Sequence, residues 1–213
     1  LTMDATKPDV KAIISDLGGV LIAVDKRPMF EQLAKYSTLS KREIARHFSH
    51  TMLTPDDLDF GRGLITPMQF YESMCRKLHL SRISFEELSE FYCDVFSRKE
   101  EAIRLLQKLG SKYVIALLSN TDALHHEKWS KLLGKDMNLF KEVILSFQVH
   151  AAKPGTKIFF VAAERLNLKP EQCVYIDDVG EYSDAAAKVG MHGINFVSVR
   201  QLKEDLLKLG ISV

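Results

Sequence analysis

Three short apolar runs of the sequence each end in side chains that can bind a metal ion or take part in catalysis. These side chains are Asp16 after the first run, Ser119 and Asn120 after the second, and Asp177 and Asp178 after the third. Apolar, β-branched runs of this length are typical of buried strands. If the three strands are parallel, their carboxyl ends meet at one edge of a sheet, where open α/β folds bind their ligands.

Together these groups suit the chemistry of a phosphoryl group and a metal ion. Adjacent carboxylates repel one another and shift one another's pKa values, and a hard divalent cation such as Mg²⁺ removes that cost. Ser119 adds a hydroxyl and backbone N–H groups near the start of a helix, an arrangement that binds anions. Lys153 lies in a Lys-Pro-Gly loop, from which its ammonium could neutralise a phosphate or the acidic cluster.

Each of these residues also fits a plain structural role when it is taken singly. Asp and Gly are ordinary turn residues, and an isolated lysine is usually a surface residue. Ser119, Asn120 or Thr121 could simply cap the helix that follows the second strand. What favours the functional interpretation is the coincidence of three strand ends.

Strand and helix signals alternate along most of the chain, which predicts the sheet that these side chains require. Strand patterns cover residues 10–14, 113–118, 143–145, 174–176 and 193–196, with helical patterns between the later ones. Such alternation is typical of an α/β fold, here a Rossmann-like parallel sheet core with helices on both faces.

Residues 28–96 break the alternation, because they show helical periodicity and almost no strand signal. Their predicted helices follow four capping residues, Ser40, Thr54, Thr66 and Ser84. We therefore expect an inserted α-helical cap subdomain at residues 24–97, between the two parts of the core domain at residues 9–23 and 98–213.

The composition argues against several classes of partner. Lys and Arg number 29 and Asp and Glu 28, for a net charge of +1, so nothing favours nucleic acid or an anionic membrane surface. No apolar run approaches the ~18 residues that cross a bilayer, and residues 1–4 lack a signal-peptide pattern. Cys75, Cys93 and Cys173 form no C-x-x-C motif and are expected to be reduced thiols of a cytoplasmic protein.

Four short motifs, in this order, resemble those of the haloacid dehalogenase-like (HAD) hydrolases, in the branch with a helical cap inserted after the first motif. The motifs are Asp16-Leu17-Gly18-Gly19-Val20-Leu21, Leu118-Ser119-Asn120-Thr121, Ala152-Lys153-Pro154 and Tyr175-Ile176-Asp177-Asp178. The resemblance covers the chain from residue 10 onward, and within the family it extends to sugar-phosphate phosphatases.

The resemblance implies a phosphatase that hydrolyses a small phosphorylated metabolite, with a sugar phosphate as one candidate. Asp16 would attack phosphorus and form an aspartyl-phosphate. Ser119, Asn120 and Lys153 would hold the phosphoryl oxygens, and the cap would close over the site and select the substrate.

The resemblance also implies a magnesium cofactor. Its ligands would be Asp16, the backbone carbonyl of Gly18, Asp177 and Asp178. The metal would neutralise negative charge and align the attack on phosphorus.

Two departures from the family pattern keep other functions open. Gly18 stands where typical family phosphatases have a second Asp as general acid and base, and Tyr182 stands where related sequences often carry Asn. His125, His126 or His150 could take over proton transfer. The alternatives are a 2-haloacid dehalogenase-like hydrolase that needs no magnesium and a catalytically weak HAD-fold binding protein.

Overall fold

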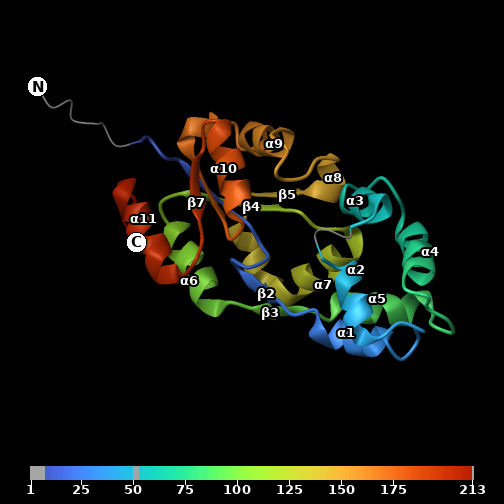
Figure 1. Ribbon diagram of the computed structural model, residues 1–213. Helices are drawn as coiled ribbons and strands as arrows, with labels where there is room; N and C mark the ends of the chain where they lie inside the picture. Colours follow the sequence, from blue (N-terminus) through green and yellow to red (C-terminus); the bar gives the residue numbers. More distant parts are fainter. Residues whose placement is uncertain (1–7, 50–52, 213) are drawn as a thin grey trace, which may run out of the picture.

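Five parallel strands form the sheet at the centre of the core (Figure 1). The computed structural model describes residues 8–49 and 53–212, so the prediction for residues 1–4 lies outside the described residues. The strand order is β5-β4-β1-β6-β7. Their bounds are β1 Ala12–Ser15, β4 Val114–Ser119, β5 Glu142–Leu145, β6 Cys173–Asp177 and β7 His192–Asn195. Every pairing in this sheet is parallel, which confirms the predicted α/β class.

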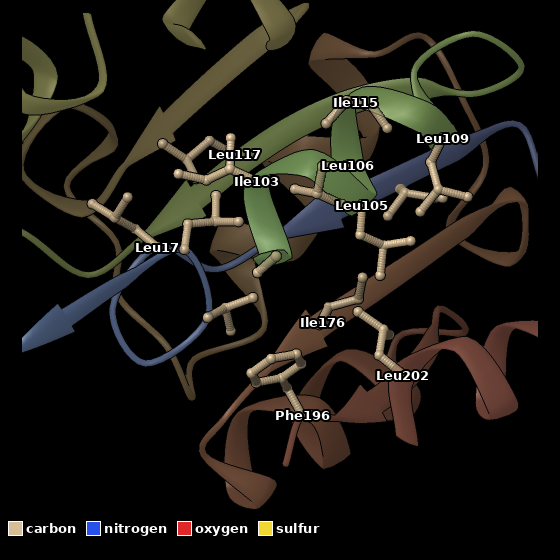
Figure 2. Close-up of a cluster of buried hydrophobic side chains, with 14 of the residues drawn as sticks. Leu17, Ile103, Leu105, Leu106, Leu109, Ile115, Leu117, Ile176, Phe196 and Leu202 are labelled. Atoms are coloured by element: carbon tan, nitrogen blue, oxygen red, sulfur yellow. The ribbon is translucent and has the colours of Figure 1, made fainter. Parts of the chain in front are cut away.

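Helices cover both faces of this sheet. One face carries α6 (Glu100–Leu109), α7 (Ala123–Leu133) and α11 (Val199–Lys208), and the other carries α9 (Lys157–Arg165) and α10 (Gly180–Lys188). The remaining short elements of the core are η2 (Gly134–Leu139), α8 (Ser146–Val149) and η3 (Pro170–Gln172). Figure 2 shows the first face, where Leu106 of α6 and Leu202 of α11 pack over Leu117 and Ile176 of the sheet.

The central strand β1 is apolar throughout because it is buried on both faces. Successive side chains of a strand point to opposite sides of a sheet. Ile13 accordingly joins the hydrophobic cluster under α6, and Ile14 joins the cluster under α9 and α10. Both side chains are fully buried, which fixes the register of β1 and the position of Asp16 just beyond its end.

The five helices that the structure describes within residues 27–93 pack around a hydrophobic cluster of their own (Figure 1). They are α1 (Arg27–Leu33), α2 (Lys41–His47), α3 (Pro55–Gly61), α4 (Pro67–Lys77) and α5 (Phe85–Cys93). All four predicted capping residues, Ser40, Thr54, Thr66 and Ser84, form capping boxes with the residue three positions on. We refer to these helices as the cap.

A two-stranded antiparallel ribbon joins the cap to the core, and the sequence analysis did not predict it. Its strands are β2 (Ile22–Val24) and β3 (Phe96–Arg98), with Ile22 opposite Arg98. Three residues are too few to show an alternating pattern, and their partners lie more than seventy positions apart in the sequence. The subdomain division at residues 24 and 97, which stays a prediction, falls within this ribbon.

The structure tests two further predictions, that the cysteines are reduced and that no apolar segment is long enough to cross a bilayer. Cys75, Cys93 and Cys173 are all free thiols, as expected. In the part of the chain that the structure describes, no helix is both long enough and apolar enough to cross a membrane.

Replacing Gly193 should destabilise the core, because α10 packs directly against β7 at this residue. A Cβ at this position would lie 2.2 Å from the backbone carbonyl oxygen of Ser183 in α10. Overpacking of this kind typically costs about 1–3 kcal/mol, so we expect Gly193→Ala to lower the midpoint of urea unfolding. Gly180→Ala is the control, since its Cβ would make an ordinary 3.6 Å contact with Asn195. Equal midpoints for the two variants would contradict this packing.

Candidate active site

The carboxyl ends of β4, β1 and β6 lie side by side, and they bring the predicted acidic residues together. β1 is paired with β4 on one side and with β6 on the other. Carboxylate oxygens of Asp16, Asp177 and Asp178 all lie within 4.8 Å of one another. Asp177 is fully buried, Asp16 is 7% exposed, and Asp178 faces solvent. Such a set of hard oxygen ligands could hold a divalent metal ion.

The ammonium group of Lys153 lies between two of these carboxylates. Its Nζ is 2.8 Å from Asp16 Oδ1 and 2.7 Å from Asp177 Oδ2, and the residue is only 4% exposed. The aromatic rings of Tyr175 and Tyr182 flank it, with centroids 5.6 Å and 5.0 Å from Nζ. Lys153 is therefore a buried cation at the centre of the acidic cluster, whereas the sequence alone left a surface lysine open.

Asn120 fixes the backbone on which Lys153 is carried. Its Nδ2 donates to the Lys153 carbonyl oxygen at 2.9 Å, and the Lys153 N–H donates to Asn120 Oδ1 at 2.9 Å. Because both polar atoms of the amide are engaged, the side chain of Asn120 positions Lys153 in this structure. The loop after β4 and the loop that carries Lys153 are thus held to each other by a single residue.

Burial and charge act in opposite directions on the ionisable groups of this cluster. Burial, with a further contribution from the charge of Asp177, raises the pKa of Asp16 to about 6, although Lys153 opposes the shift. Burial alone would lower the pKa of Lys153, but the two carboxylates outweigh it and the pKa is raised. Burial, followed by repulsion from Asp177, also raises the pKa of Asp178. A metal ion among these oxygens would relieve the repulsion.

Ser119 ends β4 beside this cluster, and it does not cap the following helix. Its Oγ makes a long, 3.5 Å contact with the carbonyl oxygen of Asn120, and the residue is buried. The N-cap of α7 is Asp122, whose carboxylate accepts from the His125 N–H at 2.9 Å. The structural alternative in which Ser119, Asn120 or Thr121 caps α7 is therefore wrong, because the chain runs three residues beyond β4 before it turns into the helix.

The backbone conformation and the close surroundings of Gly19 both favour glycine at this position. Its φ is +73°, and a Cβ at this position would lie 1.9 Å from Asp178 Oδ2. Glycine permits both the left-handed backbone and the close approach of the first motif to the carboxylate. The turn after Asp16 is thereby packed directly against the acidic pair that follows β6.

A cavity of about 450 Å³ lies between the cap and the strand ends. Lys153, Asn120 and Tyr182 line it from the core, and Phe60 and Arg62 line it from the cap. Two aromatic residues of the cap segment, Tyr36 and Tyr71, do not line it and are hydrogen-bonded within the cap, to Glu87 and to the Ile83 carbonyl oxygen. Lys153, which contacts Asp16 and Asp177, therefore connects the acidic cluster to a space whose opposite wall belongs to the cap.

Two residues of the site were not singled out from the sequence. Ser146 Oγ accepts from the Thr121 N–H at 2.9 Å and lies 2.6 Å from the Gly61 carbonyl oxygen, so it joins the site loop to the cap. Tyr175 donates a hydrogen bond to Asp177 Oδ2. Ser146 directly follows β5, and Tyr175 lies two residues before Asp177 on the same face of β6. Ser146 could have been identified because ligands bind beyond the carboxyl ends of parallel strands. Tyr175 could have been identified because side chains two residues apart on a strand point to the same face.

Comparison with known proteins agrees with this geometry. A family model described as haloacid dehalogenase-like hydrolase matches residues 10–190. The chain belongs to the haloacid dehalogenase-like hydrolases. This confirms the resemblance drawn from the four motifs and establishes a hydrolase.

Relatives of known name and known structure cover nearly the whole chain. Phosphatase MT3486 of Mycobacterium tuberculosis (strain CDC 1551 / Oshkosh) is 27% identical over 193 residues, which make up 85% of this chain and 85% of that protein. The HAD family enzyme bt-2542 of Bacteroides thetaiotaomicron, solved with magnesium and inorganic phosphate, is 26% identical with a TM-score of 0.76 over 91% of this chain and 98% of that one. The L-2-haloacid dehalogenase PA0810 is 18% identical with a TM-score of 0.63 over 85% of this chain and 82% of that one, and it shares the fold.

Removal of the buried cation should destabilise the metal-free protein in a pH-dependent way. Without Lys153, burial and the charge of Asp177 act unopposed and raise the pKa of Asp16 above its present value of about 6. A carboxyl pKa above the unfolded value of about 3.9 means that the folded state binds more protons, so stability is lost as the pH rises. We expect Lys153→Met to cost about 3–5 kcal/mol at neutral pH and less at pH 5.

The measurement is urea unfolding in the presence of a chelator at pH 5 and pH 8. Lys131→Met is the matched control, because Lys131 forms an exposed pair with Glu127 at 2.7 Å and should contribute little at either pH. A deficit for Lys153→Met that is no larger at pH 8 than at pH 5 would contradict the electrostatic account.

Proposed function

We propose that this hydrolase is a magnesium-dependent phosphatase that acts on a small phosphorylated metabolite. The observation that carries the proposal is the bridge from Lys153, which lines the cavity, to Asp16 and Asp177, whose carboxylates cluster with that of Asp178. A relative of known name is a phosphatase, and a relative of known structure holds magnesium and inorganic phosphate.

The donor set at the strand ends fits a magnesium ion. The ligands we propose are Asp16, the Gly18 carbonyl oxygen, Asp177 and Asp178. The three carboxylates offer oxygens within 4.8 Å of one another, and hard oxygen ligands are those that Mg²⁺ prefers. When bound, the metal supplies positive charge that offsets the negative charge of a phosphate ester and its attacking carboxylate.

The residues around the proposed metal site have different roles in phosphoryl transfer. The carboxylate of Asp16 attacks phosphorus to form an aspartyl-phosphate, and the ester oxygen leaves with a proton. Water then hydrolyses the aspartyl-phosphate to release inorganic phosphate and restore Asp16. We assign Lys153, Ser119 and the loop at Asn120 to hold the phosphoryl oxygens, since charge neutralisation and positioning supply most of the catalysis in such transfers.

Proton transfer to the leaving oxygen must come from a group other than residue 18, which is glycine. His125 lines the cavity, but its ring nitrogens lie 2.7 Å from Asp122 and 3.0 Å from the Tyr92 carbonyl oxygen. His126 packs against Trp129, and His150 Nδ1 lies 2.8 Å from the Arg62 carbonyl oxygen. Since all three imidazoles have structural contacts, we expect slow turnover or a preference for good leaving groups.

A 2-haloacid dehalogenase activity is the second candidate, because Asp16 could attack carbon instead of phosphorus. Likeness to the dehalogenase PA0810 extends to the fold alone, at 18% identity. Three clustered carboxylates favour a metal-dependent reaction. The dehalogenase mechanism does not need a metal ion, so this cluster favours the phosphatase.

Phosphate release with and without magnesium tests the proposed function. We expect the protein to hydrolyse an aryl phosphate or members of a panel of sugar phosphates, to lose this activity in excess chelator, and to lose it in Asp16→Asn. Activity towards haloacids that is indifferent to chelator would favour the dehalogenase. Absence of both activities would leave a HAD-fold binding protein.

Restoring a carboxylate at position 18 should accelerate turnover. Gly18 lies outside the left-handed region of φ, and an added Cβ would meet only Val24, at 3.8 Å, so the position accepts a Cβ. General acid catalysis contributes at least about 10²-fold, and it matters most for poor leaving groups. We expect Gly18→Asp to raise kcat for alkyl phosphates more than for aryl phosphates, and Gly18→Asn to raise neither. A slower Gly18→Asp enzyme with both substrates would contradict the proposed role of this position.

A further inference from the structure

The cavity between cap and core carries charges beyond those of the acidic cluster. Besides Lys153, its wall includes three groups that are cationic or can become so, Lys26, Arg62 and His125, and two acidic groups, Asp57 and Asp122. Which of these charges remain available to a ligand depends on their partners.

Three of the wall groups already have close polar partners. Lys153 lies between Asp16 and Asp177, as described above. Asp122 lies 2.7 Å from His125 Nδ1 and also accepts from the Tyr92 hydroxyl at 3.0 Å. Lys153, Asp122 and His125 therefore already have close partners within the protein.

Asp57, on the cap side, also has close partners within the protein. Its Oδ2 accepts from Lys77 Nζ at 2.6 Å, from the Thr54 N–H at 2.7 Å and from the Thr54 hydroxyl at 2.8 Å. The Lys77–Asp57 pair is largely buried, so it is little screened by solvent. Asp57 thus has one close cationic partner and a capping role.

Lys26 and Arg62 are the wall charges that remain. Among the residues that the structure describes, neither side chain has a hydrogen bond or a close ion pair, and both are exposed to solvent, although Asp57 attracts Lys26 electrostatically. Lys26 Nζ lies 5.9 Å from the ring centroid of Phe48, which also lines the cavity. Arg62 directly follows α3, whose last residue, Gly61, contacts Ser146 at the strand ends.

Apolar side chains make up much of the remaining cap wall. They include Met29, Phe48, Phe60 and Val95. Because Asp57 is already paired with Lys77, the two cations of this otherwise largely apolar cap wall favour a ligand with negative charge beyond its transferring phosphate.

We propose that Lys26 and Arg62 form an anion-binding subsite for the leaving group, so that the preferred substrates are phosphate monoesters with a second anionic group. The inference rests on the proposed phosphatase function and adds the substrate class. Asp16 and Lys153 act on the transferring phosphate, while the two cap cations bind a carboxylate or a second phosphate elsewhere on the same molecule.

Matched pairs of substrates test this subsite. 3-Phosphoglycerate and glycerol 3-phosphate differ by a carboxylate in place of a hydroxymethyl group, and fructose 1,6-bisphosphate and fructose 6-phosphate differ by a second phosphate. The first pair probes a carboxylate and the second probes a phosphate. In at least one pair we expect kcat/KM to favour the more anionic member by on the order of tenfold, the contribution of one hydrogen bond to a charged group.

Lys26→Met and Arg62→Met should each reduce this preference several-fold, and added salt should reduce it in the unmodified protein. The controls are Lys35→Met and Arg46→Met, two exposed cap residues outside the cavity wall, which should keep the full preference. Because the readout is a ratio of two substrates on one preparation, partial loss of folded protein does not affect it.

A binding experiment separates failure of the subsite from failure of the proposed function. Calorimetry with magnesium and the Asp16→Asn variant measures the affinity for each member of the two pairs without turnover. Hydrolysis of an aryl phosphate with no preference within either pair would overturn the subsite and leave the phosphatase intact. Tighter binding of the anionic members without any hydrolysis would support the subsite and overturn the phosphatase.

Discussion

The ammonium of Lys153 between the carboxylates of Asp16 and Asp177 is the interaction on which the site depends. Burying an isolated charge is very unfavourable, and attraction between buried charges offsets this cost only when the geometry is close. The 2.7–2.8 Å contacts provide that geometry, and they require the ends of β1 and β6 to be neighbours. The surrounding framework, from the buried strand β1 to the Asn120 bridge, can be understood as the support of this one arrangement.

The cap is held against this framework by polar contacts at a few points. Ser146 connects the end of α3 to the loop after β4 through Gly61 and Thr121. On the other side, the ring of Tyr92 in α5 stacks on His125 of α7 with centroids 4.0 Å apart. These contacts place a mainly apolar wall opposite the acidic cluster, where exclusion of water strengthens the electrostatic interactions.

This arrangement separates two tasks in space. Strand ends of the core supply the charged groups that would act on a phosphate, and they are fixed by the sheet. Helices of the cap supply the wall that would contact the remainder of the substrate, including Lys26 and Arg62. A change in specificity could therefore arise in the cap without disturbing the buried ion pairs, whereas a change in the glycine at position 18 would alter the chemistry itself.

The sequence alone was sufficient to predict the parallel sheet, the helical segment with its four capping residues, and the residues at the strand ends. These features depend on local periodicity and on capping, which a short stretch of sequence contains. Tertiary structure alone decided that Lys153 is buried, that Asn120 holds its backbone and that β2 pairs with β3. It also decided that Lys26 and Arg62 face one cavity. Each of these depends on contacts between residues far apart in the chain, which no local pattern records.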